Sequence, residues 1–154
     1  MNSSGNTCRG RWVCLLLMAV MGLACAVQAG DLKIDAKLVW GTNADKSPDS
    51  AHKPVSADLA KKLVKIFKWK NYFEVKAVQE SVPNRSTKRI HMSKKCELEV
   101  TEMEGPKVEV KLYGEGKLVT KTVKSLYKGD FLTLGGEDKG DNSWFIVITL
   151  LEDK

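Results

Sequence analysis

Residues 96–123 have the sequence CELEVTEMEGPKVEVKLYGEGKLVTKTV. Apolar and polar side chains alternate through most of this segment, and this alternation indicates the fold class. A period of two is the pattern of a β-strand with one buried face. The alternation is interrupted at Gly105-Pro106 and again at Gly114-Glu115-Gly116, and both interruptions are turn sequences. The segment therefore predicts three antiparallel strands joined by two hairpin turns.

The rest of the chain extends this pattern in both directions. Further strands are predicted near residues 32–40, 72–79, 88–93, 131–134 and 144–151. In the first, Leu32 to Trp40 should bury alternate side chains, while Lys33, Asp35, Lys37 and Val39 form a wet face. The last is apolar at nearly every position, so we expect it to be buried on both faces.

One helix and one long loop complete the prediction. The helix is expected over 56–68, where Ser56 can cap it and where Leu59, Leu63, Ile66 and Phe67 fall at helical spacing. Residues 41–55 are expected to form a loop. The predicted fold is mainly β (α+β): an antiparallel β-sandwich or small barrel of about eight strands, with one α-helix near the N-terminus. The lack of βαβ alternation excludes a Rossmann-type or P-loop architecture.

The first 29 residues are expected to be a signal peptide. Arg9 and Arg11 precede a short apolar run, and Val27-Gln28-Ala29 places modest side chains before a cut at Gly30. The predicted mature domain is then 30–154, in a periplasmic or extracellular location. Gly22-Leu23-Ala24-Cys25 is similar to a lipoprotein signal, so lipidation at Cys25, with membrane attachment, is the alternative.

Removal of residues 1–29 takes away Arg9 and Arg11 and lowers the formal net charge from +6 to +4. Three of the four cysteines leave with that segment, so Cys96 is the only thiol in the predicted domain and no internal disulfide is possible. We therefore expect stability to come from a packed core.

The sequence predicts no catalytic centre, cofactor or metal site. His52 and His91 are isolated and lack metal-ligand spacing, and Cys96 is in phase with apolar neighbours, as expected for an inert core thiol. Glu97, Glu99, Glu102 and Glu104 are interpreted as lying on solvated strand faces. The alternative is a small exported hydrolase or thiol enzyme that uses Cys96 or a carboxylate pair.

The candidate binding residues interleave aromatic and basic side chains. Trp69, Lys68, Lys70 and Tyr72 could offer a surface to a glycan or an anionic polymer, and Lys88 and Arg89 form a second basic patch. The competing interpretation is a helix-to-strand junction in which Phe67 and Phe73 enter the core and Trp69 covers its edge. Export argues against nucleic acid as the partner.

A partial resemblance points the same way. Residues 123–136 run from a strand through Lys128-Gly129-Asp130 and a short apolar strand to Gly135-Gly136, and Phe145–Leu150 follow as a last apolar strand. This pattern resembles bacterial outer-membrane secretins and small exported bacterial domains, whose start is similar to Ser56–Phe73. The resemblance implies a structural or adaptor role in the cell envelope and no catalytic residue. The expected function is an exported, non-enzymatic envelope protein that binds a protein or polymer partner.

Overall fold

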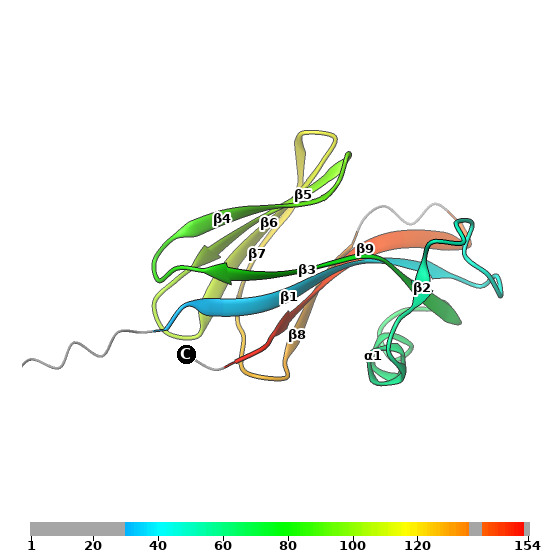
Figure 1. Cartoon of the computed structure of the whole chain (residues 1–154), viewed down its shortest axis with the longest axis horizontal. Coiled ribbons are helices and arrows are strands. Elements are labelled where there is room, and N and C mark those ends of the chain that lie inside the picture. The colour runs from blue at the N-terminus through cyan, green and yellow to red at the C-terminus, as the bar shows by residue number, and fades with distance from the viewer. Residues whose placement is uncertain (1–29, 136–139, 153–154) are drawn as a thin grey trace, which may run out of the picture.

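The computed structural model describes residues 30–135 and 140–152, which form two antiparallel β-sheets and one helix (Figure 1). The predicted signal peptide and Cys25 lie outside the described residues. The elements are β1 (Leu32–Thr42), β2 (Lys53–Pro54), α1 (Ala57–Leu63), β3 (Asn71–Val82), β4 (Thr87–Ser93), β5 (Cys96–Glu102), β6 (Lys107–Gly114), β7 (Lys117–Ser125), β8 (Phe131–Gly135) and β9 (Asn142–Leu150).

The sheets have the strand orders β2-β3-β1-β9-β8 and β4-β5-β6-β7, and neither closes into a barrel in the described residues. The architecture is therefore an open sandwich, and the predicted mainly β fold is confirmed. All of the strands expected from alternation are present. The three strands expected over 96–123 are β5, β6 and β7, paired in the predicted hairpin order.

The five-stranded sheet is covered on both faces, which gives the domain two hydrophobic cores. On one face, Ile34, Leu38, Ile146 and Ile148 pack against the inner side of the four-stranded sheet. On the other face, Val39, Phe145 and Val147 belong to a smaller cluster that includes Leu63 of α1. The continuous apolar run of β9 supplies both clusters, as its pattern predicted.

The wet face expected for β1 is only half wet. Lys33 is exposed, and Asp35 and Lys37 are partly exposed, but Val39 is fully buried because α1 and the residues around it cover that end of the sheet. The expected loop 41–55 is also too long. β1 continues to Thr42, and Lys53–Pro54 pair with Phe73 and Glu74 as the short edge strand β2.

The helix begins as predicted but is shorter. The Ser56 hydroxyl caps it by accepting a hydrogen bond from the Leu59 N–H at 3.4 Å. It ends at Leu63 because the chain tightens into turns in which the N–H groups of both Ile66 and Phe67 donate to the Leu63 carbonyl. These turns bring the Phe67 ring to 4.5 Å from that of Phe145 and leave Ile66 half exposed, so the prediction of a helical face through Ile66 is wrong.

Candidate functional site

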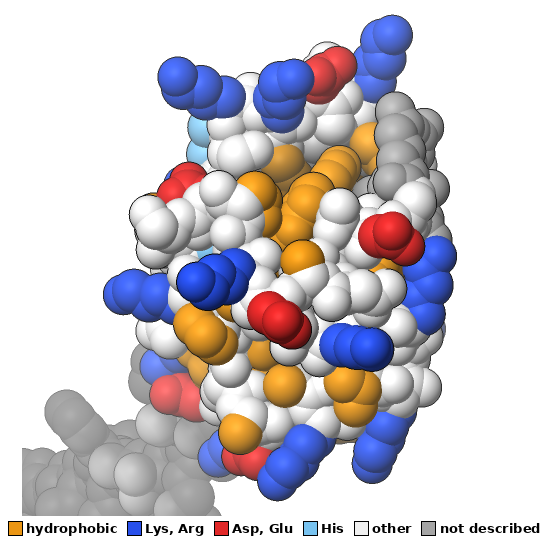
Figure 2. Space-filling view, turned by 90° about the vertical axis from the view of Figure 1, so that its right-hand side faces the viewer, with side chains coloured by type: hydrophobic (Ala, Val, Ile, Leu, Met, Phe, Trp, Pro, Cys, Tyr) orange, Lys and Arg blue, Asp and Glu red, His pale blue; other side chains and the backbone are white. Residues whose placement is uncertain are grey.

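A cleft of about 780 Å³ opens between the two sheets at one end of the sandwich. Figure 2 looks at this end of the molecule, where a strip of hydrophobic side chains lies in a hollow with charged side chains around it. The cleft is lined by residues from both sheets and their turns: Leu38, Trp40, His52, Val75, Ser93, Lys95, Cys96, Gly114, Glu115, Val119, Asn142, Ser143 and Trp144.

Two tryptophans from neighbouring strands form one wall of this cleft. Trp40 of β1 and Trp144 of β9 are directly opposite each other in the strand register. Trp40 is in phase with Leu38, and Trp144 is in phase with Ile146, so both rings are on the face that meets the four-stranded sheet. Both rings are only half-buried, whereas Leu38 and Ile146 are buried. The inner face of the five-stranded sheet therefore extends beyond the part that the four-stranded sheet covers.

Trp40 also carries a polar group that the protein leaves unused. Its Nε1–H is shielded from solvent and meets no acceptor within the described residues. The same is true of Trp69 Nε1, which lies in the smaller core cluster and does not line the cleft. An unpaired buried N–H is destabilising, by about 1–3 kcal/mol.

The two turns of the four-stranded sheet are tied together where they border the cleft. Lys95, in the β4–β5 turn, forms a 2.9 Å ion pair with Glu115, in the β6–β7 turn. The Glu115 N–H also donates to the Lys95 carbonyl at 2.8 Å. Because both charged side chains are largely exposed, the pair gives the rim a polar character and contributes little to stability.

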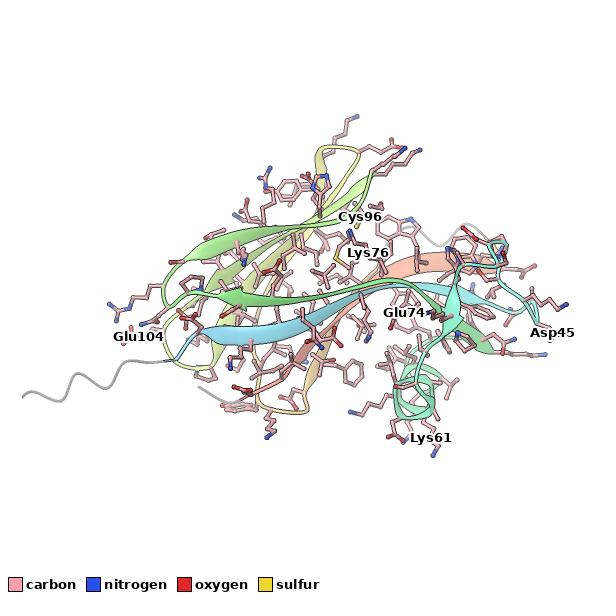
Figure 3. The ribbon with its side chains drawn as sticks, viewed as in Figure 1. Asp45, Lys61, Glu74, Lys76, Cys96 and Glu104 are labelled. Atoms are coloured by element: carbon pink, nitrogen blue, oxygen red, sulfur yellow. The ribbon has the colours of Figure 1, made fainter. Side chains whose placement is uncertain are left out.

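Cys96 lies between the sheets, as Figure 3 shows, with 4% of its surface exposed. Burial, followed by the nearby Glu97 carboxylate, raises the pKa of the thiol to about 11. The thiol is therefore protonated at neutral pH, which matches the predicted core thiol. His91 is exposed on the opposite face of the sheet and pairs with Glu97 at 2.8 Å, so it does not act on Cys96.

His52 and Cys96, which are 44 positions apart in the sequence, line the cleft together with Glu115. No hydrogen bond joins Cys96 to His52 or Glu115 in the described part of the chain. The His52 ring is instead engaged by Ser47, whose hydroxyl lies 2.6 Å from Nδ1. The three residues share a cleft without forming a nucleophile–base pair.

Of the four carboxylates predicted on solvated strand faces, Glu97 and Glu99 lie on the outer strand face but are only partly exposed, Glu102 is buried, and Glu104 is exposed in the turn after β5. Glu99 receives Lys111 at 2.8 Å and Arg89 at 3.0 Å on the outer face of the four-stranded sheet, and these contacts lower its pKa. Glu102 is buried because it is in phase with Leu98 and Val100. Its carboxylate accepts a hydrogen bond from the Arg85 backbone N–H and so holds the turn before β4.

The predicted aromatic contact residues lie in the smaller core cluster. Trp69 is 6% exposed, its ring stacks at 6.1 Å on that of Phe145, and the Tyr72 ring meets Phe145 edge-on at 6.1 Å. Of the two aromatics expected to enter the core, Phe67 packs against this cluster, whereas Phe73 is only partly buried and Tyr72 takes the buried position. The rings of Trp69 and Tyr72 therefore present little surface to a ligand.

The predicted basic residues lie apart from one another. Lys68 and Lys70 are exposed beside the smaller cluster. Lys88 pairs with Glu80 at 2.5 Å, and Arg89 pairs with Glu99 and lies over the Tyr113 ring, on the far side of the sandwich from α1. The structure does not bring these two groups into one site.

No protein-family model, curated protein or solved structure matches this chain. The resemblance to secretins and small exported domains stays a prediction. Residues 30–135 and 140–152 contain no helix long and apolar enough to cross a membrane. Within the same residues, no three His, Cys, Asp or Glu side chains gather as a metal site would require.

Proposed function

We propose that this chain is an exported, non-enzymatic binding domain of the cell envelope that takes an apolar group of a protein or polymer partner into the cleft between its sheets. The observation that carries the proposal is the pair of half-buried tryptophans, Trp40 and Trp144, facing a cleft whose other walls include Leu38, Val75 and Val119. Large, open, mostly apolar concavities with a few polar groups are typical of binding sites.

The composition of the cleft favours an apolar ligand. Side chains from both inner sheet faces line it without closing on one another, so filling it removes apolar surface from water, at about 25 cal/mol per Å². Lys95 and Glu115 at the turns meet the polar remainder of the partner.

The location rests on the sequence. Residues 1–29 have the order of a signal peptide, and the domain after them has one cysteine, buried and unpaired. Lipidation at Cys25 would place the same domain at a membrane surface.

Filling the cleft tests the proposal. Val119→Phe places a larger side chain in the cleft, and Val64→Phe makes the same change at a comparably exposed site at the end of α1 that does not line it. We expect the wild type and Val64→Phe to bind an anilinonaphthalene sulfonate dye and the same envelope partner in co-purification. Val119→Phe should weaken both at least tenfold while circular dichroism stays unchanged.

Equal binding by the two variants would contradict the proposal. The thiol enzyme is the second candidate, because Cys96 and His52 line the same cleft. Its raised thiol pKa argues against it. Activity abolished by Cys96→Ser in a folded protein would favour it.

A further inference from the structure

Strand β7 combines three features that no other described strand shows together. It is one of the two edge strands of the four-stranded sheet, with β4 at the other edge, and it pairs only with β6. It is nine residues long, so about half of its backbone N–H and C=O groups point away from the sheet. Leu118, Val119 and Val123 are 54%, 46% and 50% exposed along it.

The exposed apolar side chains of the domain gather here. Six large hydrophobic residues are strongly exposed among the described residues, and four of them, Leu118, Val119, Val123 and Tyr127, lie on β7 or directly after it. Scattered single residues of this kind are normal on a protein surface, but a concentration on one edge strand marks an interaction site.

The charge of the segment is one-sided. Residues 116–129 contain Lys117, Lys121, Lys124 and Lys128 and no aspartate or glutamate. Lys121 is paired, at 2.7 Å, with Glu109 of β6. Lysines on an edge strand discourage a second copy from pairing with it, because two copies would bring eight lysines together. The same lysines attract an extended segment that carries carboxylates.

We propose that β7 is a docking strand for an extended, acidic segment of a partner protein, which adds to the four-stranded sheet as a fifth strand. Backbone hydrogen bonds to the outer edge of β7 provide affinity, and the lysines with Leu118 and Val123 select a segment that mixes acidic and apolar side chains. Val119 also lines the cleft, so a docked strand would run along one cleft wall.

The test uses a labelled nine-residue peptide of alternating valine and threonine with three glutamates, and a control peptide with lysine at those three positions. We expect the glutamate peptide to bind the protein in fluorescence anisotropy and the lysine peptide not to bind. Binding of the glutamate peptide should also slow amide exchange in residues 117–125. Added salt should weaken the binding.

A charge-reversed pair of variants locates the site. Lys117→Glu with Lys124→Glu should weaken binding about tenfold, because two favourable ion pairs become repulsive. Lys65→Glu with Lys70→Glu makes the same net-charge change at exposed positions beyond α1 and should leave the affinity within about twofold.

Three outcomes would overturn the inference. The first is no binding of the glutamate peptide at about 1 mM, a concentration at which even weak specific contacts are detected. The others are an equal loss of peptide affinity in both double variants, and slowed amide exchange of residues 117–125 caused by dimerisation of the protein without peptide. None of the four substituted lysines lines the cleft, so failure of this test leaves the cleft proposal intact.

Discussion

Gly41→Ala should destabilise the domain although it adds only one methyl group. A Cβ at Gly41 would lie 2.8 Å from Cε3 and 3.0 Å from Cδ2 of Trp69, and 3.2 Å from Cε1 of Phe145. The backbone cannot withdraw, because β1 is the central strand and Gly41 is paired with Tyr72 on one side and Ser143 on the other. Two stacked rings in a closed cluster must therefore move.

The expected cost follows from two opposing effects. Overpacking a core costs about 1–3 kcal/mol, and replacing glycine returns about 0.4–1 kcal/mol by restricting the unfolded chain. The net destabilisation should be about 1–2 kcal/mol, or about 4–8 °C in Tm for a domain of this size. Urea unfolding followed by near-UV circular dichroism measures it, with an unchanged m-value as the sign that both end states persist.

Gly135→Ala is the matched control. No atom lies within 4 Å of a Cβ built there, and its φ is not in the left-handed region, so this change should be neutral or stabilising by up to about 1 kcal/mol. Equal urea midpoints for the two variants would refute the packing argument. Trp69→Phe in the Gly41→Ala background should cost less than the sum of the two single changes, because the smaller ring relieves the contact.

Other predictions address the second core, the thiol, the surface charges and the N-terminus. Trp69→Ala should lower the free energy of unfolding in urea by about 3–5 kcal/mol, as for other buried aromatic side chains, and an unchanged urea midpoint would show that Trp69 is a surface residue rather than part of the core. Iodoacetamide should alkylate Cys96 slowly in the folded protein at pH 7 and quickly in urea, because burial raises its pKa to about 11; fast labelling of the folded protein would revive the thiol enzyme. The lowered pKa of Glu99 means that its contribution to stability is present above the unfolded value of about 4.3 and is lost as pH falls through the folded value, so Lys111→Met should reduce the loss of stability between pH 7 and pH 3. The intact mass of protein recovered after export should match a chain that begins at Gly30, and a mass with a lipid on Cys25 would show the alternative.

Local alternation was sufficient to predict the strands but not their partners. On β5, alternate side chains point to the same face of the sheet, and that face is buried. Glu102 is buried with Cys96, Leu98 and Val100, so its position in the alternation determined its orientation, although a carboxylate is normally expected on the surface. The helix was overextended because Ile66 and Phe67 fit a helical repeat, whereas packing on Phe145 required the chain to turn after Leu63. Trp69 was conspicuous in sequence beside its lysines, yet nothing local indicates that Phe145, 76 positions away, would stack on it.

The candidate site escaped prediction because it depends on where one sheet stops covering the other. Trp40 and Trp144 were both placed in predicted strands, and the phase of Trp40 with Leu38 made it an inward residue. An inward residue is core if the facing sheet reaches it and a binding surface if it does not. On the facing sheet, Cys96 and Gly114 lie at the ends of β5 and β6 next to the turns that border the cleft, so little of that sheet remains to cover the two rings. The point at which the four-stranded sheet stops covering the five-stranded sheet depends on where the turns of the first lie and on how long the strands of the second are. The residues that determine these two features are far apart in the chain. Inserting two residues into each strand of the β4–β5 hairpin should therefore cover Trp40 and Trp144. We expect the stability of the domain to rise and dye binding to be lost together. Higher stability with dye binding retained would place the ligand site elsewhere.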